Sequence, residues 1–100
     1  MQITDVRVKI LNFDNRLRAV ASIAFDDEIV IHDIKVIDGE NGMFLAMPSR
    51  KIGDGRYRDI AHPISSTTRE KIEEAIFTKY NEELEKQSSI ESEQLNEEQE

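Results

Sequence analysis

The spacing of apolar residues changes once along this chain, and the change divides it into a strand-forming part and a helix-forming part. From Gln2 to about Ile60 the apolar residues mostly alternate with polar ones, which is the two-residue period of β-strands. After His62-Pro63 they recur every three or four residues, the period of an α-helix. One hundred residues suffice for one modest core, so the sequence predicts a single α+β domain.

The first part is predicted to form an antiparallel β-meander of about five strands. Short turns rich in Asp, Asn and Gly separate the apolar runs, and such turns join strands that are neighbours in a sheet. Small alanines in the second run predict close packing against a helix or a partner chain. The predicted strands comprise residues 2–11, 16–25, 28–38, 43–47 and 56–60, with the tip of a hairpin loop at Gly53-Asp54-Gly55.

The third predicted strand is apolar along both of its faces. Ile29, Ile31 and Ile37 alternate onto one face and Val30, Ile34 and Val36 onto the other, so neither face is clearly polar. A strand of this kind is usually covered on both sides. Because the chain has one evident helix, we expect a second subunit to supply the other cover.

The helix-forming part is predicted to span about Thr68 to Lys86. Thr67 and Glu70 have the spacing of a capping box, in which each side chain bonds the backbone N–H near the other. The apolar stripe expected to lie on the sheet comprises Ile72, Ala75, Ile76, Tyr80 and Leu84.

The last residues, 87–100, are predicted to be a disordered acidic tail that follows a folded domain of residues 1–86. Glu, Gln, Ser and Asn dominate the tail, so it cannot bury enough apolar surface to offset the entropy of ordering. Residues 1–71 hold equal numbers of basic and acidic side chains, and the net charge of −8 therefore arises after residue 71. The acidic balance does not exclude an anionic partner for the folded part.

Cationic side chains gather around the predicted hairpin loop and the start of the helix. Backbone N–H groups at a helix start bind anions, and nearby cations strengthen this tendency. An aromatic ring between two arginines offers a surface on which a nucleic-acid base can stack. The candidate nucleic-acid-binding residues are Arg50, Lys51, Arg56, Tyr57, Arg58, Arg69 and Lys71. The competing interpretation is a set of ordinary solubilising charges, with the ring packed in the core.

Neither a catalytic nor a metal site is predicted. The residues His32, Asp33, Asp38, Asp59 and His62 invite a metal or acid–base interpretation, but their spacing matches no recognised ligand set, and structural roles explain them better. Without cysteine there is no thiolate chemistry. The serines and threonines at 65–68 fit helix capping rather than nucleophilic catalysis. We therefore expect no cofactor, no small-molecule substrate and no enzymatic activity.

The chain shows no signal peptide and no apolar stretch approaching the roughly 20 residues that cross a bilayer. We expect a cytoplasmic protein without a membrane partner.

Three segments together resemble the SpoVG family (stage V sporulation protein G). They are MQITDVRV, IHDIKVIDGENGMFLAMPS and DGRYRDIAHPISSTTREKI, and the resemblance covers about residues 1–84. It implies a β-rich α+β domain, a homodimer, and binding to DNA and RNA by a small bacterial cytoplasmic regulator of septation, sporulation or, in other bacteria, gene expression such as virulence programmes. Carried over by position, the cations around the loop and helix start match the family's basic region. Gly53 departs from a common proline and Arg56 from a common acid.

The leading hypothesis is therefore a dimeric nucleic-acid-binding regulator whose cationic loop and helix start contact phosphates. The alternative is a protein-interaction module that acts on cell-division or septation machinery through an exposed sheet edge, without binding nucleic acid. The net charge of −8, which repels nucleic acid at long range, motivates the alternative.

Overall fold

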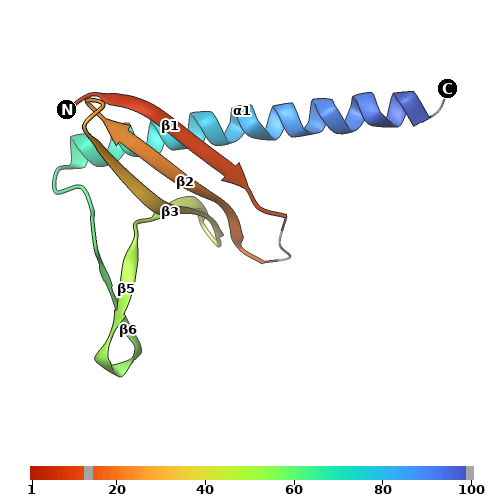
Figure 1. Cartoon of the computed structure of the whole chain (residues 1–100). Helices are drawn as coiled ribbons and strands as arrows, with labels where there is room; N and C mark the ends of the chain where they lie inside the picture. The colour runs from red at the N-terminus through yellow and green to blue at the C-terminus, as the bar shows by residue number, and fades with distance from the viewer. Residues whose placement is uncertain (13–14, 99–100) are drawn as a thin grey trace.

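The structure, a computed structural model, describes residues 1–12 and 15–98, with side chains described to residue 87, and shows two small sheets and one long helix (Figure 1). The elements are β1 (Ile3–Ile10), β2 (Leu17–Phe25), β3 (Ile29–Gly39), β4 (Gly42–Ala46), β5 (Ser49–Ile52), a short 3₁₀ turn (Gly53–Gly55), β6 (Arg56–Asp59) and α1 (Ser66–Glu98). The predicted α+β class and the meander followed by one helix are confirmed.

Strands β1 to β4 form an antiparallel meander in chain order. Its β2–β3 turn at Asp26-Asp27 has positive φ at both residues, which Asp tolerates better than most side chains. The turn also holds the N-terminus, because Asp26 Oδ1 accepts a hydrogen bond from the N–H of Gln2 at 2.8 Å. The predicted turn at 14–15 is described only at Asn15, whose Oδ1 accepts a bond from the N–H of Leu17.

The strands β5 and β6 leave this sheet and pair with each other, so the structure has six strands in two sheets where about five in one meander were predicted. Pro48 explains the break, because a proline has no N–H with which to continue the ladder. Its carbonyl instead accepts a hydrogen bond from the N–H of Ile60 at 2.7 Å. The resulting β5–β6 hairpin projects away from the main sheet (Figure 1).

Helix α1 packs across one face of the main sheet, mainly against β1 and to a smaller extent against β2. The fully buried alanines of β2, Ala19 and Ala21, belong to the same core as the buried helix residues Ile72, Ile76 and Tyr80. The predicted close packing of a helix on these alanines is confirmed. Leu84, which was predicted to join the stripe, is exposed.

A β-bulge in β3 explains why that strand's sequence is apolar on both faces. Ala21 pairs with Ile34 and Ile23 pairs with Ile31, so two residues of β3 lie opposite one residue of β2. Asp33, inside the bulge, has a φ of 62°. The alternation shifts by one residue here, and Ile34 and Val36 are buried in the same core as the helix residues Ile72, Ile76 and Tyr80. The other face of β3 is not covered by this chain, and its cover by a second subunit stays a prediction.

The helix begins and ends elsewhere than the sequence predicted. Its cap is Ser65, whose Oγ accepts a hydrogen bond from the N–H of Thr68 at 3.1 Å, so the predicted capping box of Thr67 and Glu70 is wrong. The backbone continues as helix to Glu98, beyond the predicted end near Lys86, because no Gly or Pro interrupts this run of helix-forming residues. Disorder of residues 87–100 in solution stays a prediction. Among the described residues, no helix is long and apolar enough to cross a membrane.

Candidate nucleic-acid interface

The β5–β6 hairpin carries five of the seven predicted binding residues. Its tip is the 3₁₀ turn Gly53–Gly55, as predicted, with a positive φ of 41° at Asp54 and 76° at Gly55. A short turn followed by a residue of positive φ is a common three-residue hairpin connection. The whole of β6 is exposed and β5 is exposed apart from half-buried Ile52, so the hairpin offers both of its faces.

The register sorts the hairpin's side chains onto two faces. Arg50 lies directly opposite Arg58, and Ile52 lies opposite Arg56, which places all three arginines on one face because side chains alternate along a strand. We call Arg50, Arg56 and Arg58 the arginine face. Like charges placed opposite each other destabilise a strand pair. An anion between them removes that repulsion.

The opposite face of the hairpin carries Lys51 directly across from Tyr57. Tyr57 is 70% exposed, so the alternative of a ring packed in the core is wrong. The bond from Ile60 to Pro48 marks a hydrogen-bonded pair, and alternation makes Lys51 and Tyr57 a non-hydrogen-bonded pair, whose side chains lie closer together. This face therefore combines a free ring with a neighbouring cation, separately from the arginines.

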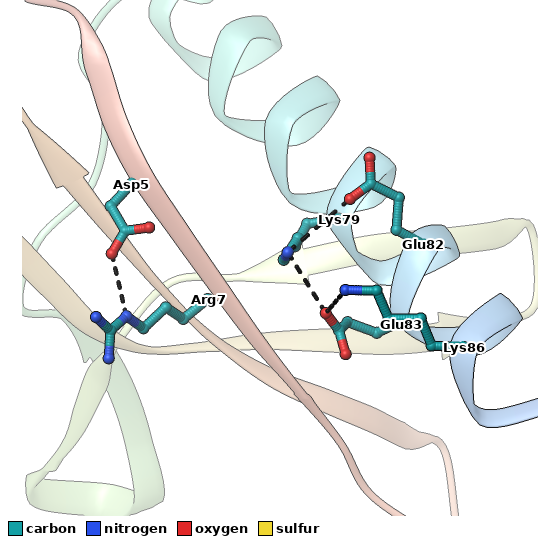
Figure 2. Close-up of polar contacts among 6 residues, drawn as sticks. All are labelled: Asp5, Arg7, Lys79, Glu82, Glu83 and Lys86. Atoms are coloured by element: carbon teal, nitrogen blue, oxygen red, sulfur yellow. Dashed lines mark hydrogen bonds and ion pairs between the residues drawn. The ribbon is translucent and has the colours of Figure 1, made fainter. Parts of the chain in front are cut away.

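Ion pairing distinguishes the hairpin cations from many others in the described part of the chain. Arg7, Arg16 and Arg18 of the main sheet region each lie within 4 Å of a carboxylate. Lys79 and Lys86 of the helix do so as well (Figure 2). The four hairpin cations form no ion pair within the described residues, although Asp54 and Asp59 belong to the same hairpin. Their charge is available to an external anion.

The structure does not bring the two helix cations to the hairpin. Arg69 and Lys71 lie in the first turns of α1, which packs on β1 and β2. Lys71 lines a groove of about 630 Å³ between the helix and β1, together with Ile3, Val6 and Ala75 among others. The predicted site thus divides into a hairpin part and a separate helix part.

The residues that invited a metal or acid–base interpretation are dispersed. His32 Nδ1 lies 2.9 Å from Ser22 Oγ on the main sheet, and Asp38 forms an ion pair with Arg18 at 3.3 Å. His62 Nδ1 lies 3.1 Å from the carbonyl oxygen of Pro63. Over the described ranges, no group of three or more His, Asp or Glu side chains is arranged to hold a metal ion.

Two exposed isoleucines were not among the predicted site residues, namely Ile60, the last residue of the predicted strand 56–60, and Ile64 after it. Ile60 is 67% exposed and Ile64 is 94% exposed. The segment around them, Ile60-Ala-His-Pro-Ile64, has neither the strand nor the helix period, and that lack of periodicity in an apolar run was the available signal.

The sequence profile of the SpoVG family matches residues 1–82, which include the whole hairpin and the helix start. The chain belongs to the SpoVG family. Proteins named "Putative septation protein SpoVG" are similar to it over nearly its whole length. The protein from Finegoldia magna is 74% identical over 98% of this chain and 91% of its own length. The protein from Alkaliphilus oremlandii is 54% identical over 97% of this chain and its own full length.

A third SpoVG protein, from Brevibacillus brevis, is 62% identical over 81% of this chain and 85% of its own length. The family profile ends at residue 82, before the acidic end of the helix. The sequence resemblance to SpoVG is thereby confirmed, and the candidate interface lies within the shared part.

Proposed function

We propose that this SpoVG protein is a nucleic-acid-binding regulator, acting as a homodimer in a septation or sporulation programme, and that the β5–β6 hairpin is its contact with DNA or RNA. The observation that carries the proposal is the set of four cations on a projecting hairpin that form no ion pair with any side chain the structure describes. The role in septation rests on the names of its relatives. Cytoplasmic location belongs to the same proposal.

The arrangement suits phosphates for electrostatic reasons. An arginine guanidinium binds phosphate oxygens through paired N–H donors, and three arginines on one face of a ribbon can follow successive phosphates. The hairpin holds four cations against two acids, so its local charge opposes the chain's net charge of −8. A single hairpin gives few contacts, and a homodimer doubles them, which raises the affinity through a second, linked binding event.

The two faces predict different partners. Phosphate contacts by the arginine face need no exposed base and therefore serve duplexes and single strands alike. Stacking on Tyr57 needs an unpaired base, because duplex bases are stacked on each other. We expect Tyr57→Ala to weaken single-stranded RNA or DNA binding more than duplex binding.

The test is binding of labelled DNA and RNA over a series of salt concentrations. Alanine at Arg50, Lys51, Arg56 and Arg58 should reduce the slope of log K against log salt by roughly three to four per hairpin on duplex DNA. The matched control places alanine at four cations that have ion pairs, Arg7, Arg16, Arg18 and Lys86, and changes net charge equally. Equal slopes for the two variants would refute the hairpin as the interface.

The rival function is a protein-interaction module for division machinery. The open edge of β1 favours it, because β1 has a paired neighbour on one side only and an edge strand can recruit a partner strand. If the unmodified chain binds neither DNA nor RNA at low salt, nucleic-acid recognition is excluded and this second function takes its place.

A further inference from the structure

The strand β1 and the helix α1 border a groove at one edge of the main sheet. β1 has a strand neighbour, β2, on one side only, and the helix packs mainly on β1. The groove between them has a volume of about 630 Å³, and its apolar lining includes Ile3, Val6 and Ala75, which are only partly buried on the core. An edge strand beside an apolar groove can bind an extended peptide as an additional strand.

The backbone of β1 has hydrogen-bonding groups that point out of the sheet along this edge. The N–H of Leu11 donates to the carbonyl of Arg18 at 2.9 Å, which makes these two residues a hydrogen-bonded pair of the β1–β2 ladder. By alternation, Arg7 and Lys9 also bond to β2, and the residues on either side of them direct their N–H and C=O groups toward the open edge. We call these the outward residues, and they are Val6, Val8 and Ile10.

A strand added to this edge would direct every second side chain toward the helix. Val6 and Val8 lie opposite Ile23 and Ala21 of β2, which are fully buried, so the outward residues have their side chains on the helix side of the sheet. The residues of an added strand that bond to them share this side. Apolar side chains at those positions would cover the exposed part of Val6 and enter the groove beside Ala75, whose small size leaves room for them.

The intervening residues of an added strand would meet two cations, Arg7 and Lys9, on the other side of the sheet. The side chain of Arg7 is 84% exposed and bonds Asp5 through its Nε at 3.0 Å (Figure 2). Lys9 forms no ion pair within the described residues. Relative to an added strand both cations occupy non-hydrogen-bonded positions, where facing side chains lie closest. Acidic residues are favoured there, because opposite charges across a strand pair attract.

The same two cations disfavour a second copy of this chain on the edge. The two-fold arrangement that bonds all three outward residues is centred on Val8 of each copy. It would place Arg7 of each copy opposite Lys9 of the other, so that like charges face each other twice. Such pairs destabilise a sheet. The edge therefore suits a strand of different sequence, with acids where this chain has cations.

We propose that the open edge of β1 and the groove beside α1 bind an extended segment of another protein in which apolar and acidic residues alternate. The apolar residues bond to the outward residues and pack toward the helix, and the acids lie opposite Arg7 and Lys9. Glu74 and Glu82 line the helix side of the groove, and the acids of the segment point away from them. This surface is separate from the β5–β6 hairpin, so the inference does not depend on nucleic-acid binding.

The first test is amide hydrogen exchange of the full chain with a synthetic peptide of alternating valine and glutamate, about seven residues long, a usual strand length. At about 1 mM the peptide should slow exchange of the outward residues at least about tenfold. The amides of Arg7 and Lys9, which already bond to β2, should change less than about twofold. A control peptide with lysine in place of glutamate should protect neither set. β4, the other edge strand of the sheet, should show no protection with either peptide.

The second test separates the charge of the edge from its backbone. Lys9→Glu should weaken binding of the valine–glutamate peptide about fivefold and strengthen binding of the valine–lysine peptide by a similar factor. The matched control is Lys35→Glu on β3, which changes net charge equally away from the edge and should leave both affinities within about twofold. Val8→Pro removes an outward N–H that β2 does not use, and it should weaken binding at least about tenfold. Circular dichroism checks that the variants remain folded.

Three results would overturn the inference. The valine–glutamate peptide does not protect the outward residues, or the valine–lysine peptide protects them equally well. Lys9→Glu and Lys35→Glu bind the two peptides alike. The outward residues are already protected in the chain alone in a concentration-dependent way, which would assign the edge to a second copy. Alanine at the four hairpin cations should leave peptide binding unchanged, so loss of nucleic-acid binding in the unmodified chain would refute only the proposed function.

Discussion

Replacing Arg58 tests whether this arginine lowers the stability of the hairpin while it raises the affinity for an external anion. Arg50 and Arg58 are a cross-strand pair of like charge. Two unit charges about 6 Å apart in water interact by about 0.7 kcal/mol, and physiological salt roughly halves this. Arg58→Glu turns the repulsion into an attraction, so it should stabilise the hairpin by about 0.7 kcal/mol. Arg58→Gln removes the charge and should give about half that gain.

The assay for the hairpin is amide hydrogen exchange of β5 and β6. A gain of about 0.7 kcal/mol slows exchange through local opening about threefold, in the order Arg, Gln, Glu from fastest to slowest. Affinity for duplex DNA should fall in the order Arg, Gln, Glu, while the stability of the hairpin rises in that order, and each substitution should lower the salt slope by about one per hairpin. If Arg58 serves to bind an anion, the variant with the most stable hairpin should have the lowest affinity for DNA.

The reasoning is refuted if Arg58→Glu speeds exchange in the hairpin, because the two guanidinium groups would then not repel each other in solution. It is also refuted if binding is unchanged while the hairpin becomes more stable. Raising the salt concentration supplies the internal control, since screening should shrink the difference in exchange between Arg58 and its replacements.

Three further substitutions test the fold. Ile34→Ala removes a fully buried side chain and should lower the free energy of unfolding by about 2–5 kcal/mol in urea titrations, whereas Ile29→Ala, on the same strand but exposed, should lower it by less than about 1 kcal/mol. Gly55→Ala, at a φ of 76°, should destabilise the hairpin by about 1–2 kcal/mol, and Gly53→Ala, with open space and no positive φ, should not; exchange rates in β6 report both. Ser65→Ala removes the helix cap and should lower the thermal midpoint by an amount equivalent to about 1 kcal/mol.

The strands and the helix were predictable because the apolar residues follow the two-residue period of a strand in one part of the sequence and the period of a helix in the other. Alternating Val6, Val8 and Ile10 identify β1, and the three-to-four spacing of Ile72, Ile76 and Tyr80 identifies α1. The bulge at Asp33 was not predictable, since it depends on the register with β2, and register is a long-range property. Because of this bulge, the sequence of β3 looks apolar on both faces although only one face is buried.

The candidate site was predictable as a list of cations but not as an arrangement. Sequence proximity placed Arg50, Lys51, Arg56 and Arg58 together, and the hairpin register then divided them between two faces. Arg69 and Lys71 follow soon after in the sequence, yet they belong to the helix. The exposure of Ile64 was missed because an apolar residue near a proline is as easily placed in a core, and only the lack of a strand or helix period around it pointed to the surface.

Gly39 and Phe44 link the β3–β4 turn to the open sheet face in a way that bears on how this family varies. A Cβ added at Gly39 would lie 2.8 Å from Cε1 of Phe44, and the backbone there needs no positive φ. Glycine is therefore present to make room for the ring. Any larger residue at position 39 would push the Phe44 ring away from β3 while leaving the turn intact. Substitutions at position 39 and at position 44 should consequently occur together among related sequences, with a side chain at 39 permitted only where the ring at 44 has become small.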